Sequence, residues 1–173
     1  NVYSRLGLDH LELKEQFEDV SENDSEYLSD ELLYRQAVQK LSTYNQPFFT
    51  YIVAASSHTP FTLEGLQDRS KINIDVGKYK YSFFCYYFEA VNYADYAFGV
   101  FIDELKNAGL YEDTAILVFG DHNGLSMYDE QMLDFLAQTD SDLTDVDIKL
   151  SYTKVACGMK IPGVKNVTIE KPV

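Results

Sequence analysis

An acidic and an imidazole side chain stand next to each other directly after an apolar run. Asp121 and His122 follow the run 114–119, and Gly120 and Gly124 flank them, so the backbone can turn sharply there. A carboxylate oxygen and an imidazole nitrogen together suit a borderline divalent ion such as Zn²⁺ or Mn²⁺. Two ligands do not complete a metal site. The alternative for an isolated pair is an aspartate that caps the turn, beside a histidine that only packs.

Two further polar side chains are candidates for the same chemistry. His58 follows a second apolar run, 48–55, and its imidazole can donate to a substrate oxygen or act as a general acid or base. The alternative is a loop histidine bonded to a carbonyl. Ser126 comes four residues after His122 and can bring a hydroxyl to the same place, although by itself it is one serine among many.

The elements that must position these residues alternate between strand and helix patterns. Short apolar runs predict strands over 48–55, 114–119 and 155–161, the first two buried. Helices are predicted from an N-cap at Ser29 or Asp30 to a stop at Gln46 and Pro47, from 81 to 107 with a stop at Gly109, and within the acidic stretch 129–147. The core stripe predicted for the long helix is Phe84, Phe88, Val91, Asp95, Phe98, Ile102 and Leu105.

This order of elements predicts an α/β fold, a layered sheet with helices on its faces. In open sheets of this class ligands bind beyond the carboxyl ends of the strands. The loops that carry His58 and the Asp121-His122 pair are therefore expected at one edge of the sheet.

Composition narrows the class of partner. The 173 residues hold 14 Lys and Arg against 28 Asp and Glu, a formal charge of −14, which excludes a generic nucleic-acid binder. An anionic substrate would need a localised positive centre, and a bound metal ion is the natural candidate. Cys85 and Cys157 are too few for a disulfide scaffold; free thiols are expected, and pairing stays open. The apolar stretch 81–101 is interrupted by polar residues and is not expected to span a membrane.

Several motifs occur in a fixed order along the chain. They are His-Thr-Pro-Phe at 58–61, Tyr-Ala-Asp at 93–95, Gly-Leu-Tyr at 109–111, Gly-Asp-His-Asn-Gly at 120–124 and Ile-Pro-Gly-Val at 161–164. In this order they resemble the lipoteichoic acid synthase group of phosphoglycerol transferases, within the sulfatase and alkaline phosphatase superfamily. The resemblance covers nearly the full chain, and its two histidine motifs together are fairly specific.

The resemblance implies a role for each candidate residue. Asp121 and His122 would be two ligands of a catalytic ion, Mn²⁺ first and Mg²⁺ or Zn²⁺ as alternatives. His58 would contact the phosphoglycerol group of a lipid-linked substrate, and Ser126 would line the same pocket. The implied fold is alkaline phosphatase/sulfatase-like but incomplete.

The resemblance also implies that part of the site lies elsewhere. The family's nucleophilic threonine, its glutamate ligand and the arginine and tryptophan of its substrate pocket all precede the matched region. Residues 1–173 are therefore expected to be the C-terminal portion of a catalytic domain, inactive without the N-terminal part that bears the nucleophile. The family's catalytic domains lie on the extracellular face of the bacterial cell membrane, anchored by preceding transmembrane helices, and the same location is expected here.

The implied reaction is transfer of glycerol phosphate from a phosphatidylglycerol-like lipid to a cell-envelope acceptor. Two alternatives remain open. One is a sulfatase or phosphodiesterase of the same superfamily, which would deliver its ester to water. The other is a non-catalytic remnant domain that keeps the fold without the nucleophile.

Overall fold

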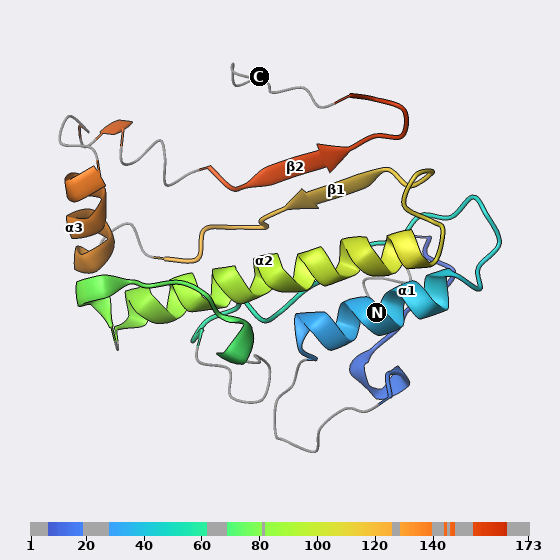
Figure 1. Ribbon diagram of the computed structural model, residues 1–173, viewed down its shortest axis with the longest axis horizontal. Helices are drawn as coiled ribbons and strands as arrows, with labels where there is room; N and C mark the ends of the chain where they lie inside the picture. The colour runs from blue at the N-terminus through green and yellow to red at the C-terminus, as the bar shows by residue number, and fades with distance from the viewer. Residues whose placement is uncertain are drawn as a thin grey trace. The chain divides into compact units, whose positions relative to one another are not determined.

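The computed structural model describes residues 7–18, 28–61, 69–80, 82–125, 129–139, 144, 146–147 and 154–165. The chain forms two compact units, Asn1–Glu104 and Leu105–Val173, and each is described by itself. In chain order the elements are η2 (Lys14–Gln16), α1 (Asp30–Leu41), η3 (Arg69–Lys71), η4 (Gly77–Tyr79), α2 (Phe83–Asn107), β1 (Ile116–Phe119), α3 (Glu130–Thr139) and β2 (Cys157–Lys160) (Figure 1).

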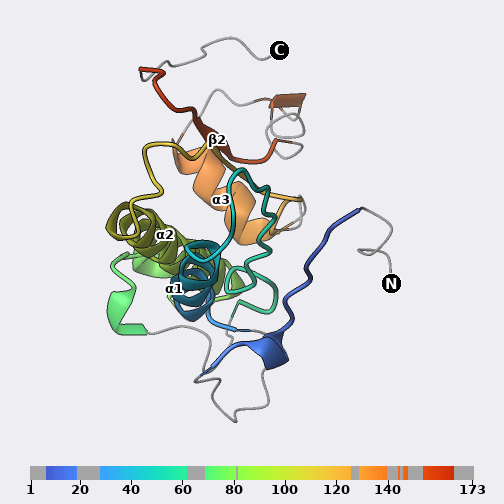
Figure 2. The ribbon, with the colours of Figure 1, turned by 90° about the vertical axis from the view of Figure 1, so that its right-hand side faces the viewer.

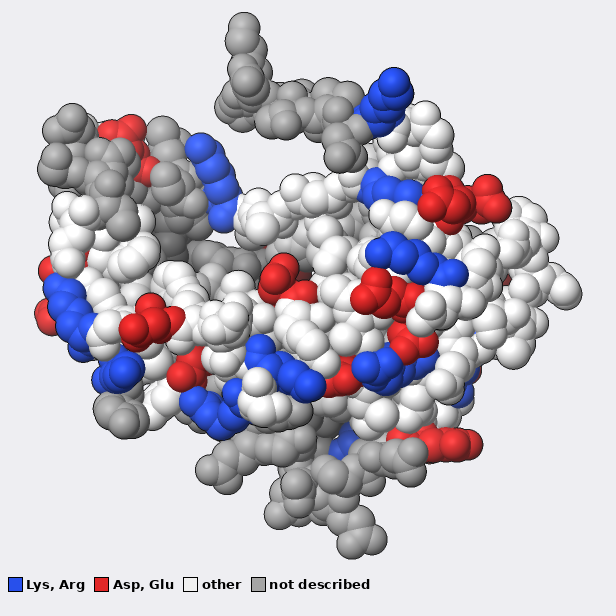
Figure 3. All heavy atoms as spheres, viewed as in Figure 1, with Lys and Arg blue, Asp and Glu red and all other residues white. Residues whose placement is uncertain are grey.

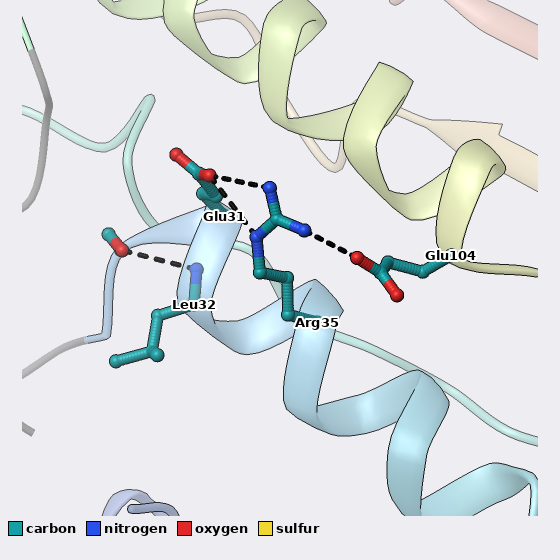
Figure 4. A network of polar contacts seen from close by, with 5 residues as sticks. Glu31, Leu32, Arg35 and Glu104 are labelled. Carbon is teal, nitrogen blue, oxygen red and sulfur yellow. Dashed lines mark hydrogen bonds and ion pairs between the residues drawn. The ribbon is translucent and has the colours of Figure 1, made fainter. Parts of the chain in front are cut away.

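Helix α1 begins where the sequence predicts, but it ends at Leu41, before the predicted stop at Gln46 and Pro47. Ser29 is its N-cap, with extended backbone and a side-chain oxygen that accepts a hydrogen bond from the Leu32 N–H at 3.3 Å. This bond satisfies one of the amide groups that a helix leaves without an internal partner at its start. Farther along, Arg35 pairs with Glu31 on its own helix at 3.0 Å and with Glu104 on α2 (Figure 4).

Helix α2 confirms the long helix of the sequence analysis, with its start two residues later than predicted. In the first unit α1 runs alongside α2 in both views (Figures 1 and 2), and the Tyr34 and Phe101 rings lie 5.0 Å apart. The predicted core stripe was partly wrong, because Val91 and Asp95 are exposed. The buried residues of the helix are Phe84, Cys85, Ala90, Tyr93, Ala97, Phe101 and Leu105.

The end of α2 also follows the prediction. Gly109 has a φ of +70°, a conformation that costs a residue with a side chain much more than it costs glycine. The Leu110 N–H donates to the Leu105 carbonyl at 2.9 Å, the bond that closes a Schellman-type helix end.

Replacement of Gly109 and replacement of Gly99, which lies inside α2, should change the stability of the chain in opposite directions. An added Cβ meets nothing within 4 Å at either Gly109 or Gly99, so only the backbone decides. We expect Gly109→Ala to destabilise the chain by about 1 kcal/mol, because of its left-handed φ. Gly99→Ala should stabilise it by about 0.5–1 kcal/mol. Urea denaturation of the two variants checks this, and equal shifts in one direction would contradict it.

Strands β1 and β2 form an antiparallel pair in the second unit. Ile116 faces Lys160 and Phe119 faces Cys157 in the register. The predicted third strand is thereby confirmed in its central residues. The prediction of burial for the second strand was wrong, because Leu117, Val118 and Phe119 are all exposed. The antiparallel pairing also places the carboxyl ends of β1 and β2 at opposite ends of the pair.

The predicted strand over 48–55 is not present as a strand. Its backbone has no ladder partner among the described residues, and the side chains of Phe49, Tyr51 and Val53 are exposed. The prediction of a strand covered on both faces was therefore wrong, because such a strand needs neighbouring strands, and none pairs with this run among the described residues.

The remaining predictions of the fold are simpler to report. Helix α3 lies within the acidic stretch 129–147 as expected. Cys85 is buried, Cys157 is exposed, and the two do not form a disulfide with each other. Within the described ranges, no helix combines the length and the apolarity needed to cross a membrane.

Candidate functional site

The Asp121-His122 pair lies in the turn that leaves β1. Gly120 extends the pairing by one residue, since its N–H donates to the Ala156 carbonyl at 3.0 Å. A Cβ at Gly120 would lie 3.3 Å from the Val155 Cβ, which is a tight contact. The chain then turns, and the side chains of Asp121 and His122 are 78% and 65% exposed, with Oδ1 and Nε2 at 3.8 Å.

The His122 ring is oriented by its neighbour. Its Nδ1 lies 2.9 Å from the carbonyl oxygen of Asn123. Because a carbonyl can only accept, Nδ1 carries the hydrogen, and in the neutral ring Nε2 bears the lone pair. A hydrogen bond from the second ring nitrogen to a carbonyl is the usual support of a metal-binding histidine. The nitrogen suited to a metal is thus the one nearest to Asp121.

The two donor atoms fit one ion, but they are only part of its shell. With metal–ligand bonds of about 2.0–2.2 Å, neighbouring donors of a tetrahedral ion lie roughly 3.3–3.6 Å apart, close to the 3.8 Å observed here. Over the part of the chain that the structure describes, no group of three or more His, Cys, Asp or Glu side chains could hold a metal ion. A metal ion held by this pair would therefore need at least one further ligand.

His58 lies in a tight turn of the first unit. Its N–H donates to the Ala55 carbonyl at 2.9 Å, and its own carbonyl accepts from the Phe61 N–H at 3.1 Å. The exposed ring is oriented as in His122, because Nδ1 lies 2.7 Å from the Thr59 carbonyl. Phe61 anchors the end of the turn: it is buried, with its ring 5.0 Å from that of Phe83, and has a φ of +65°, which is rare for a bulky residue.

The structure thus treats the predicted residues differently. It brings Asp121 and His122 together at the end of β1. His58 belongs to the first unit and the pair to the second, so their convergence on one substrate stays a prediction. Ser126 lies outside the described residues.

The sequence predicts only a possible capping role for Asp30. The structure gives its side chain further hydrogen bonds. Its side chain is fully buried and accepts two hydrogen bonds from the segment that leads to His58. No sequence signal beyond its place at the start of a helix distinguishes it from the chain's other acidic residues, most of which are expected in water.

Acidic residues outnumber basic residues in this chain, but the two kinds are not segregated on the face drawn in Figure 3. Acidic and basic side chains are intermingled there over α1 and α2. The ion pairs of Arg35 with Glu31 and Glu104 are part of this pattern. A phosphate group approaching a chain of net charge −14 would gain from a bound cation more than from this mixed surface.

Comparison with known proteins gives the family. Residues 2–147 match the family model Sulfatase. Lipoteichoic acid synthase 1 of Bacillus subtilis is 30% identical over 139 residues, which are 80% of this chain and 20% of the relative. Lipoteichoic acid synthase of Staphylococcus saprophyticus is 28% identical over 172 residues, 98% of this chain and 25% of the relative. The chain thus spans 20% to 25% of the length of these relatives.

Two solved structures are similar in fold. The lipoteichoic acid synthase LtaP from Listeria monocytogenes matches with a TM-score of 0.74 and 28% identity, over 95% of this chain and 40% of that one. An alkaline phosphatase superfamily protein from Vibrio parahaemolyticus matches with a TM-score of 0.62 and 23% identity, over 92% of this chain and 34% of that one. The helices and the antiparallel strand pair therefore belong to an α/β fold of the alkaline phosphatase/sulfatase type, of which this chain represents a part.

Proposed function

The chain belongs to the sulfatase family, and from that premise we propose that residues 1–173 form the C-terminal portion of a phosphoglycerol transferase catalytic domain. The proposed reaction moves glycerol phosphate from a phosphatidylglycerol-like lipid to a cell-envelope acceptor. The relatives of this chain that are named lipoteichoic acid synthases favour this class of reaction. The proposal depends on one observation: the Asp121 Oδ1 and the His122 Nε2 lie 3.8 Å apart at the end of β1.

Each candidate residue has one task in this proposal. Asp121 and His122 hold a divalent ion, Mn²⁺ first, with Mg²⁺ and Zn²⁺ as alternatives. When bound, such an ion would polarise a phosphoryl oxygen as a Lewis acid and activate the nucleophile. His58 and Ser126 orient the glycerol-phosphate head. With only two ligands the chain alone should bind Mn²⁺ weakly and turn over no substrate.

The partner required by this proposal is a preceding part of the same catalytic domain, which would bring the nucleophile and the remaining ligand. Exposed apolar side chains support it. Leu117, Val118 and Phe119 on β1, and Phe49 and Tyr51 in the run 48–55, are exposed large apolar side chains that a further part of the domain could cover. We place the whole domain on the extracellular face of the bacterial cell membrane, anchored by helices that precede the chain.

A second candidate function is hydrolysis. The family model that matches residues 2–147 is Sulfatase, so a sulfatase or phosphodiesterase that delivers its ester to water would use the same pair of ligands. The two functions differ in where the phosphate or sulfate group goes, since transfer requires an acceptor other than water.

The test is turnover of a fluorescent phosphatidylglycerol by the full-length gene product that carries this chain. Transfer predicts fluorescent diacylglycerol together with glycerol phosphate on the acceptor, and both should be lost with a chelator. Free glycerol phosphate without acceptor product, or cleavage of an aryl sulfate instead, would favour hydrolysis. No turnover of any of these esters with Mn²⁺, Mg²⁺ or Zn²⁺ present would support a remnant domain and overturn the proposal.

A further inference from the structure

A buried carboxylate ties the start of α1 to the segment before His58. Asp30 is 0% exposed, and its Oδ1 accepts hydrogen bonds from the Ala55 N–H at 2.9 Å and the Ser56 N–H at 2.8 Å. In return, the Asp30 N–H donates to the Ser56 Oγ at 3.0 Å. We call this reciprocal set, which joins residues 26 apart in the chain, the Asp30–Ser56 clasp.

The clasp places a carboxyl group in the interior of the first unit. Asp30 is the first residue of α1, where the unpaired N–H groups of the helix favour a negative charge. Its second oxygen, Oδ2, is buried without a hydrogen-bond partner in the described structure. The pKa of Tyr34, one turn farther along, is raised to about 12 by burial and by the negative charge of Asp30. Burial of a carboxyl group costs free energy unless hydrogen bonds compensate for the lost water, and Oδ1 accepts two of them.

What the clasp holds is the turn that carries His58. Ala55 and Ser56 are the first residues of that turn, and the Ala55 carbonyl accepts the His58 N–H at 2.9 Å. At the other end the buried Phe61 ring lies 5.0 Å from Phe83 and 5.2 Å from Tyr87 on α2. The backbone of the His58 turn is therefore held at both ends, while the imidazole itself is exposed.

We propose that Asp30 is a positioning residue, which fixes the backbone of residues 55–56 and thereby places the imidazole of His58 for contact with the substrate. This inference depends on the proposed function for the role of His58, but the clasp itself does not. Two separate measurements on the full-length gene product therefore distinguish a failure of one from a failure of the other.

The first measurement is hydrogen exchange, followed by mass spectrometry of peptides that cover residues 50–61. Asp30→Ala leaves two amides without their acceptor, so we expect exchange in this segment to accelerate roughly tenfold or more. Glu31→Gln is the matched control: it changes the next acid of α1, which pairs with Arg35 and not with the turn, and should leave exchange in this segment unchanged. Unchanged exchange in Asp30→Ala would overturn the clasp.

The second measurement is a double-mutant cycle on kcat/KM with fluorescent phosphatidylglycerol. Asp30→Ala should lower kcat/KM by roughly tenfold to a hundredfold. In a chain that already carries His58→Ala it should cause no further loss, because both substitutions remove the same contact between the His58 imidazole and the substrate. If the double variant instead lost kcat/KM by the product of the two single losses, the proposal that Asp30 acts through His58 would be overturned. Wild-type turnover by His58→Ala would overturn the role of His58 in the proposed function, and the exchange result would still decide on the clasp.

Two milder variants cover the case in which Asp30→Ala does not fold. Asp30→Asn keeps an oxygen for the Ala55 and Ser56 amides, so most of kcat/KM should be retained. Ser56→Ala removes the acceptor of the Asp30 N–H and keeps the two backbone amides that donate to Asp30, so it should give an intermediate loss that also vanishes in the His58→Ala background. A loss in Asp30→Asn as large as that of His58→Ala would contradict positioning by hydrogen bonds.

Discussion

Replacement of His122 by alanine is expected to reduce turnover of phosphatidylglycerol by the full-length gene product about a thousandfold. In the proposed function His122 supplies one of the two metal ligands of this chain, with its Nε2 3.8 Å from Asp121 Oδ1. Charge stabilisation by a catalytic ion is worth several kcal/mol, and each 1.36 kcal/mol is roughly a factor of ten in rate. Steady-state rates with saturating Mn²⁺ measure the loss.

A nearby acid provides the control for this substitution. Asp113 is exposed in the segment that precedes β1, so Asp113→Asn changes the local charge without touching the pair. Its rate should stay within about twofold of the wild type, since exposed charges contribute little. If His122→Ala and Asp113→Asn turned over the lipid equally fast, the metal role of the pair would be excluded.

The largest expected effect on stability is at Phe84. Its side chain is 1% exposed at the start of α2, with ring centroids 4.9 Å from Tyr79 and 4.7 Å from Phe88. Phe84→Ala should reduce the free energy of unfolding by about 3–5 kcal/mol, because it removes buried apolar area and leaves a cavity. Urea denaturation followed by circular dichroism gives the value.

Phe83 is the matched control, since it is the same residue type one position earlier and is 44% exposed. Phe83→Ala should cost less than half as much, although its ring contacts Phe61 at 5.0 Å. Equal losses at the two positions would mean that burial does not set the contribution of these rings, and the assignment of the core face of α2 would have to be revised.

The site was predictable as far as its residues are close in sequence. Asp121 and His122 are adjacent, and the apolar run before them and the glycines around them were enough to predict a turn that presents both side chains. The structure adds the Asn123 carbonyl, which orients the imidazole. Whether His58 reaches the same substrate depends on how distant segments pack, and no local pattern contains that information.

For the fold, the sequence by itself determined the elements whose causes are local. Ser29 starts α1, Gly109 ends α2, and the run at 157–160 forms β2, because capping, left-handed backbone and strand propensity act over a few residues. Tertiary structure decided everything that needs a distant partner. The apolar run 48–55 has no ladder partner in the described structure, and α2, with apolar residues on several sides, buries a face that periodicity alone did not select. Asp30 can be buried because backbone N–H groups 25 and 26 residues away donate hydrogen bonds to its carboxyl oxygen, and such a contact leaves no trace in local spacing.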